Sequence, residues 1–134
     1  PDGSAWRVLV ESAPDAEDDD AEPRVIELDG IAVATSGDRW HHRDIPDGNG
    51  ANRRVSHTID PRTGMPVADA PAAVTVIAAD AMHADAWATA LTVLGADDGF
   101  ALAQRRGLAA RFLLRGTDGA EERMTDAFRT HLAA

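Results

Sequence analysis

Apolar and polar positions alternate in the first part of the chain, and this pattern predicts strands. WRVLVE at 6–11 alternates as an amphipathic strand does, while RVIEL at 24–28 and IAVAT at 31–35 are rich in β-branched residues. The last two runs are separated by Asp29 and Gly30, a strong short hairpin signal. We therefore predict a β-meander at the N-terminus.

Polar stretches interrupt this pattern at three places. SAPDAEDDDAEP at 12–23 is too acidic to pack and predicts a solvated hairpin loop. SGDRWHHRDIPDGNGANRR at 36–54 is rich in Gly, Asp, Asn and Pro and predicts a long surface excursion, which returns into a strand at 54–59. DPRTGMP at 60–66 predicts a tight, stiff turn, because its prolines and glycine restrict the backbone.

A fully apolar run opens the second half of the chain. AAVTVIAA at 72–79 has the length of a strand and predicts a central strand that is buried on both faces. Asp80 is suited to cap a helix that follows, with apolar residues at helical spacing until Gly95 ends it. A second short helix is expected at 97–107.

The C-terminal part predicts one more strand, a turn and a tail whose spacing favours a helix. ARFLLRG at 110–116 reads as a strand, and TDG at 117–119 as a turn. The tail at 120–132 has apolar residues at helical spacing, which favours a helix, although propensity does not exclude a strand. These elements together predict one α+β domain in which an antiparallel sheet packs against a helical pair.

Charge and composition narrow the possible partners. The 134 residues carry a net charge of −10, which disfavours nucleic acid and anionic membrane surfaces as partners. An acidic protein that handles a nucleotide needs a divalent cation or a helix N-terminus to tolerate phosphate. The chain has no cysteine, which excludes disulfides and thiolate ligands, and no apolar run near the ~20 residues that a membrane span requires. Any signal or lipid anchor of the parent protein is expected upstream of Pro1.

Two oxygen-bearing side chains lie four residues apart on the first predicted helix. Asp85 and Thr89 therefore share one helix face. A carboxylate and a hydroxyl suit Mg²⁺ or Ca²⁺ and make a poor zinc site. The alternative is structural: Asp85 as a first-turn acid favoured by the helix dipole, and Thr89 as a threonine that bonds back to its own helix. Spacing alone favours this structural alternative.

His57 is the histidine with the most suggestive context. It lies at the end of a predicted strand, three residues before Asp60, where the chain enters the turn. A neutral imidazole there could accept the proton of an attacking hydroxyl. The alternative is a turn histidine without a chemical role, which is the commoner outcome for a lone histidine. The remaining histidines are read as surface or structural residues, although one of them lies near the proposed metal face: His41, His42, His83 and His131.

The turn itself offers both structural and binding residues. Asp60 is suited to cap it, and Gly64 allows a positive φ. Arg62 either meets a phosphate through its forked guanidinium or is simply solvated, and the two interpretations are balanced. Ser36 and Gly37 end a strand and either present backbone N–H groups to a ligand or turn the chain, with the turn favoured.

Three stretches, VATSGD at 33–38, SHTIDPRTGMPV at 56–67 and ADAMHADAWATAL at 79–91, resemble the FAD:protein FMN transferase (ApbE) family in their order and spacing. The middle motif is long and specific. The resemblance spans nearly the whole chain but only the latter part of a family member. It implies one half of the T-fold-type architecture of that family, so that 1–134 would be a single C-terminal, metal-carrying domain. The other half, with adenine-binding residues and a glycine-and-lysine loop, is expected elsewhere in the parent protein.

The resemblance implies a chemistry and a set of residues for it. Family members move the FMN part of FAD onto a Thr or Ser hydroxyl of an acceptor protein and release AMP. By this resemblance Asp85 and Thr89 bind Mg²⁺, which would neutralise the pyrophosphate, and His57 is the catalytic histidine. Residues that would contact FAD as substrate are Ser36, Gly37, Ile59, Asp60, Arg62 and Thr63.

Two rival functions remain open at this level. One is a Mg²⁺-dependent FAD pyrophosphatase that uses water in place of the protein hydroxyl, and the other is a non-catalytic flavin-binding module. The expected partners are FAD, a flavin-acceptor protein, and either the other half of the parent protein or a second copy of the chain. Because positioning dominates such phosphorus chemistry, we expect the 134-residue chain alone to transfer FMN poorly. Family members often work outside the cytoplasm at the membrane.

Overall fold

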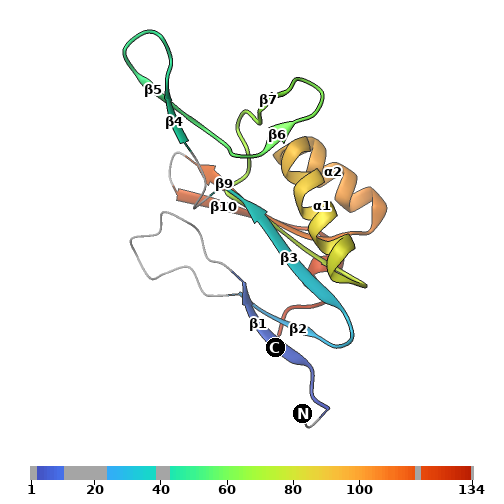
Figure 1. Cartoon of the computed structure of the whole chain (residues 1–134). Coiled ribbons are helices and arrows are strands. Elements are labelled where there is room, and N and C mark those ends of the chain that lie inside the picture. The colour runs from blue at the N-terminus through green and yellow to red at the C-terminus, as the bar shows by residue number, and fades with distance from the viewer. Residues whose placement is uncertain (1–2, 11–23, 39–42, 117–118, 134) are drawn as a thin grey trace.

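The computed structural model describes residues 3–10, 24–38, 43–116 and 119–133, and its centre is a four-stranded antiparallel sheet. The strand order is β10-β9-β8-β3, so β8 and β9 are central and β3 lies at one edge (Figure 1). The bounds are β3 Ala32–Gly37, β8 Ala73–Ala78, β9 Ala109–Gly116 and β10 Gly119–Met124. The apolar run at 72–79 is thus a central strand, as its pattern predicts.

Two helices cover one face of this sheet. They are α1, Ala81–Leu94, and α2, Ala96–Arg106. Asp80 caps α1 by accepting a hydrogen bond of 2.9 Å from the His83 N–H, and the chain leaves α1 at Gly95 with a φ of +83°. The prediction of the helix and both of its ends is confirmed. The core between helices and sheet contains Val74, Val76, Ala88, Leu91, Ala103, Ala110 and Phe112.

The opposite face of the sheet is covered by a strand pair and a short helix. β1, Trp6–Val10, and β2, Arg24–Leu28, pair with each other in antiparallel fashion, and α3 spans Asp126–Arg129. The acidic loop expected between β1 and β2 lies outside the described residues. The core on this side contains Val10, Ile26, Leu28, Ile77, Ala109, Met124 and Phe128.

The predicted hairpin between 24–28 and 31–35 is wrong in its pairing. The chain does turn at Gly30, whose φ is +65°. However, β2 pairs with β1, whereas β3 pairs with β8 in the other sheet. The physical reason is burial, because Ile26 and Leu28 of β2 pack on the sheet face that carries Ile77, so β2 stacks on the sheet instead of extending it. The N-terminal β-meander is therefore not formed.

The predicted surface excursion contains an extra hairpin. β4, Arg43–Pro46, pairs with β5, Asn52–Val55, and this two-stranded ribbon projects from the body of the molecule (Figure 1). The strand expected at 54–59 is wrong, because β5 ends at Val55 and the chain bends at 56–58 before β6, Ile59–Asp60. After the turn, β7, Met65–Pro66, pairs with β6.

The tail differs from the helix favoured by its spacing. Its first half is β10, which pairs with β9 along its length, and only 126–129 are helical. The edge of β9 supplies backbone partners that outweigh the intrinsic preference of the tail. The turn predicted at 117–119 lies largely outside the described residues. None of the described helices is long and apolar enough to cross a membrane. The α+β class, with an antiparallel sheet against a helical pair, is confirmed.

Candidate functional site

The end of β3 lies against α1, which brings two of the predicted site segments together. Ser36 is the penultimate residue of β3, and its Oγ is 3.5 Å from the Thr89 Oγ1 of α1. Gly37 is paired with Ala73 of β8 and so belongs to the strand, which makes the favoured interpretation of Ser36 and Gly37 as a turn wrong. A Cβ on Gly37 would lie 2.4 Å from the carbonyl oxygen of Ala72. Glycine is needed here for the close approach of two strands.

Asp85 and Thr89 lie on the exposed part of α1, and Thr89 is next to the end of the edge strand β3. The residues of α1 that are buried are Ala84, Ala88, Leu91 and Thr92, whereas Asp85 and Thr89 are both exposed. One turn of helix separates them, so their oxygens project from the same side. The interpretation of Asp85 as a first-turn acid is wrong, because α1 begins at Ala81 and its first turn contains no acidic residue.

The turn at 60–66 has the compact shape that its sequence predicts. The Asp60 carbonyl accepts hydrogen bonds from the N–H of Thr63 at 3.2 Å and of Gly64 at 2.8 Å, and Gly64 has a φ of +69°. The Met65 N–H donates to Thr63 Oγ1 at 3.2 Å. Asp60 and Gly64 therefore have the structural roles expected of them, and the Thr63 side chain also stabilises the turn.

Asp60 and Arg62 also form a side-chain pair within the turn. The Asp60 carboxylate accepts from Arg62 Nε at 2.9 Å and from Arg62 Nη2 at 2.8 Å, and its Oδ1 accepts from the Arg62 N–H at 2.9 Å. The hydrogen bonds from Arg62 lower the pKa of Asp60 and raise the pKa of Arg62. Asp60 is thus held as a carboxylate, and the guanidinium is oriented by it.

His57 is exposed between two buried neighbours. Ser56 and Thr58 are buried, and the Thr58 N–H donates to Ser56 Oγ at 3.1 Å. The Thr58 carbonyl accepts from the Val67 N–H at 2.9 Å, which ties the segment to the chain beyond the turn. The backbone directly after His57 is therefore anchored, while His57 itself is exposed.

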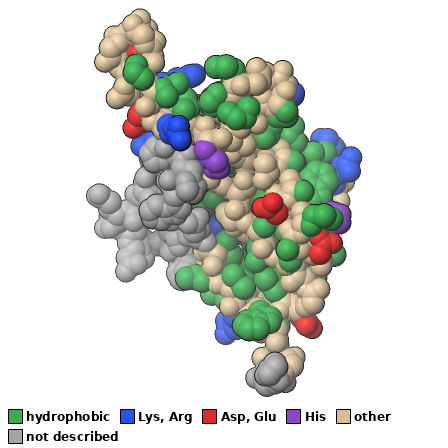
Figure 2. Space-filling model, in the orientation of Figure 1, with side chains coloured by type: hydrophobic (Ala, Val, Ile, Leu, Met, Phe, Trp, Pro, Cys, Tyr) green, Lys and Arg blue, Asp and Glu red, His purple; other side chains and the backbone are tan. Residues whose placement is uncertain are grey.

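The turn and α1 border one broad, mostly apolar cleft. Its volume is about 700 Å³, and Thr89 shares its lining with Ile59 and Arg62 of the turn segment. Figure 2 shows hydrophobic side chains gathered over this upper part of the molecule. The structure therefore brings the turn to the helix face that carries Thr89. The cleft is lined by Ile59, Pro61, Arg62, Ala86, Thr89, Ala90, Val93 and Leu94.

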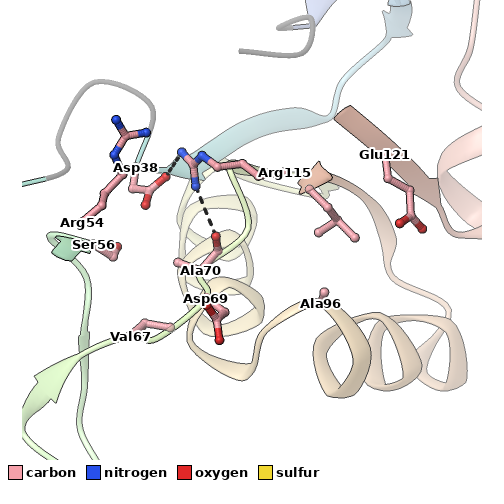
Figure 3. Close-up of a pocket in the computed structure, with 10 residues that line it drawn as sticks. Asp38, Arg54, Ser56, Val67, Asp69, Ala70, Ala96, Arg115 and Glu121 are labelled. Atoms are coloured by element: carbon pink, nitrogen blue, oxygen red, sulfur yellow. Dashed lines mark hydrogen bonds and ion pairs between the residues drawn. The ribbon is translucent and has the colours of Figure 1, made fainter. Parts of the chain in front are cut away.

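A second, more polar cavity of about 370 Å³ lies between the end of β3, the end of β5 and the end of β9 (Figure 3). Its wall contains an ion pair in which Arg115 Nη2 is 2.5 Å from Asp38 Oδ1. No local pattern in the sequence predicts this pair, since its members are 77 residues apart. The cavity is lined by Asp38, Arg54, Ser56, Val67, Asp69, Ala70, Ala96, Leu114, Arg115 and Glu121.

Within the part of the chain that the structure describes, no three His, Asp or Glu residues are grouped as a metal site. On α1 the chain offers one carboxylate, from Asp85, and the hydroxyl of Thr89, with the Ser36 hydroxyl beside it. Such an oxygen set fits a hard cation that keeps water and phosphate in its coordination shell.

Comparison with known proteins agrees with the motif resemblance. The model of the ApbE family matches residues 1–112. The chain belongs to the ApbE family. A relative from Klebsiella pneumoniae (strain 342), named FAD:protein FMN transferase, is 34% identical over 131 residues, which are 98% of this chain and 35% of the relative. A relative of the same name from Escherichia coli (strain K12) is 35% identical over 99% of this chain and 36% of its own length.

Solved structures of ApbE family members share the fold. The apo form of the Pseudomonas stutzeri flavinyl transferase ApbE superposes with a TM-score of 0.79 at 42% identity, covering 100% of this chain and 39% of that one. The flavin transferase ApbE from Vibrio cholerae gives a TM-score of 0.74 at 30% identity, covering 95% of this chain and 38% of that one. The chain thus spans little more than a third of the length of these relatives.

Proposed function

We propose that this chain is the C-terminal, metal-carrying part of an enzyme that transfers FMN from FAD to a Thr or Ser hydroxyl of an acceptor protein. The observation that carries the proposal is the convergence of the three motif segments. Ser36 of the first segment contacts Thr89 of the third, and Ile59 and Arg62 of the second line the same cleft as Thr89. Relatives that match nearly all of the chain are named FAD:protein FMN transferase, which supports the same reaction.

Asp85 and Thr89 would hold Mg²⁺ in this proposal. Both side chains are exposed on one side of α1 and offer the oxygen donors that Mg²⁺ prefers. When bound, Mg²⁺ would neutralise the negative charge of the FAD pyrophosphate. Such neutralisation would offset the repulsion between a dianionic group and a chain with a net charge of −10.

The turn segment would supply the remaining groups of this half of the site. His57 would accept the proton of the acceptor hydroxyl, since it is exposed and the backbone directly after it is anchored. Arg62 would meet a phosphate oxygen with the donors that Asp60 leaves available, because a guanidinium has five N–H groups. Further contacts with FAD would come from Ser36, Gly37, Ile59, Asp60 and Thr63.

The reaction is tested in the full-length parent protein with FAD, Mg²⁺ and a set of peptides that carry Thr or Ser, with Ala-substituted peptides as controls. Flavin fluorescence on a denaturing gel measures covalent transfer, and chromatography measures AMP. We expect one AMP for each flavin attached. Covalent flavin on no peptide, together with AMP and free FMN, would establish a pyrophosphatase, and FAD binding without AMP would establish a binding module.

The metal assignment is tested by Asp85→Asn. The substitution removes a charged ligand and keeps the shape, and we expect the rate at low Mg²⁺ to fall more than about 100-fold, since even residues that only orient ligands change metal affinity or activity 10–100-fold. Asp29→Asn is the matched control, because Asp29 is also exposed and Asn-Gly suits the same turn. Equal rates for the two variants would remove Asp85 from the metal site.

A further inference from the structure

The end of β3 is held by a partly buried ion pair that the proposed chemistry does not use. Asp38 directly follows β3, and its side chain is only 5% exposed. Its carboxylate accepts a hydrogen bond of 2.5 Å from Arg115 Nη2. Arg115 belongs to β9, and β8 lies between β9 and β3 in the sheet. The pair therefore connects the two strands that flank β8.

The same two residues also fix the segment that leads into β8. Arg115 Nη1 donates to the Ala70 carbonyl at 3.4 Å, and the Asp38 N–H donates to the Ala72 carbonyl at 3.3 Å. Figure 3 shows the Arg115 guanidinium between Asp38 and Ala70, with a dashed line to each. Three chain segments thus meet at this arginine: the end of β3, the entry to β8 and the end of β9.

Asp38 lies two residues after Ser36 in the chain. Because β3 is an edge strand of the described sheet, its end has a neighbouring strand on one side only. The Ser36 hydroxyl, on the side of β3 that meets α1, is 3.5 Å from Thr89 Oγ1. A displacement of the β3 end would therefore change the position of Ser36 relative to Thr89 directly.

We propose that Asp38 and Arg115 are positioning residues that set the distance between the end of β3 and Thr89, and thereby the affinity of the site for Mg²⁺. This inference rests on the proposed function, in which Thr89 holds the metal. Neither residue lines the cleft that contains Thr89, so the pair acts through Ser36. The charges of the Asp38 carboxylate and the Arg115 guanidinium offset each other, so that the pair neither attracts nor repels the cation strongly.

A purely structural role is the competing explanation, because removing Arg115 or Asp38 would leave the other charge without this partner, and Asp38 is buried. The two explanations predict different effects on Mg²⁺ affinity. A structural pair lowers the melting temperature and leaves Mg²⁺ affinity unchanged in the molecules that remain folded. A positioning pair weakens Mg²⁺ binding, and the loss depends on Ser36.

The experiment uses the full-length protein with Asp38→Asn, Ser36→Ala and the double variant, each with its melting temperature recorded. Mg²⁺ affinity is measured by isothermal titration calorimetry on FAD-loaded protein without an acceptor, at a temperature where every variant is folded. Arg24→Gln is the matched control, since Arg24 forms a part-buried ion pair of 3.1 Å with Glu122 away from the cleft. A wild-type protein that binds no Mg²⁺ refutes the proposed metal site itself.

We expect Asp38→Asn to weaken Mg²⁺ binding about tenfold, the lower end of the range for residues that orient metal ligands. In the Ser36→Ala background the same change should weaken binding less than twofold, because the contact through which it acts is already gone. Arg24→Gln should leave the affinity unchanged. If Asp38→Asn lowers the melting temperature but binds Mg²⁺ as the wild type does, or weakens binding equally in both backgrounds, the positioning role is wrong.

Discussion

Replacing Gly37 with alanine tests how closely the end of β3 must approach the start of β8. The added Cβ would lie 2.4 Å from the Ala72 carbonyl oxygen and 2.9 Å from the Ala73 Cα. Both neighbours are backbone atoms, so no side-chain rotation relieves the overlap. Carbon atoms in ordinary contact are about 3.5–4.0 Å apart, and β3 must therefore move by about 1 Å.

The cost of this movement follows from overpacking. Extra methyl groups in packed interiors cost about 1–3 kcal/mol, and an overlap with backbone belongs at the upper end. We expect Gly37→Ala to lower the free energy of unfolding by about 3 kcal/mol and the melting temperature by about 10 °C. The shift would also separate Ser36 from Thr89, now 3.5 Å apart at their hydroxyl oxygens, and so weaken Mg²⁺ binding by the proposed site.

Thermal and urea unfolding followed by circular dichroism measure the stability, and calorimetry of the full-length protein measures Mg²⁺ affinity. Gly48→Ala is the control, because nothing lies within 4 Å of a Cβ there and the φ of +82° leaves only a backbone cost. That cost is about 1–2 kcal/mol. Unfolding of Gly37→Ala at wild-type temperature would show that the strands tolerate a wider spacing and would refute the reasoning.

Two further predictions concern the sheet end and the turn. Thr125 is buried, and its Oγ1 accepts from the Ala110 N–H at 3.0 Å and from the Phe128 N–H at 3.3 Å, so Thr125→Val should lower the free energy of unfolding by about 2 kcal/mol in urea titrations. An unchanged urea midpoint would contradict these bonds. Hydrogen bonds from Arg62 lower the pKa of Asp60 from 3.8, so the stabilisation from this pair should be complete above pH 3.8 and lost only as pH falls through the lower folded value. NMR titration of the Asp60 carboxyl measures this pKa, and we expect Arg62→Gln to raise it. A wild-type Asp60 pKa that is not lowered would count against the pair.

Elements whose ends are determined by residues close to those ends could be predicted from the sequence. The apolar run at 72–79, the cap at Asp80 and the stop at Gly95 fix β8 and α1 by local chemistry alone. The turn at 60–66 is likewise predictable, because Asp60 and Gly64 determine its shape within a few residues. Spacing along α1 also predicts that Asp85 and Thr89 share a face.

Pairing between distant segments was not predictable in the same way. The Asp29-Gly30 signal indicates a reversal of the chain but does not specify that β3 pairs with β8, some forty residues later. Apolar residues at helical spacing favour a helix for the tail at 120–132, yet the first half of this tail pairs with β9 as the strand β10. The Asp38–Arg115 pair depends on the pairing of β8 with both β3 and β9, so the sequence contains no local sign of it.

The position of β3 in the sheet has a consequence for the dynamics of the protein. In the described sheet β3 lies at an edge and pairs with β8 alone, whereas β8 and β9 each lie between two strands. Local openings therefore cost least where a single outer element detaches. We expect amide hydrogens of β3 to exchange faster than those of β8 and β9. Each opening of β3 would transiently break the contact between Ser36 and Thr89 while β8 and β9 stay folded.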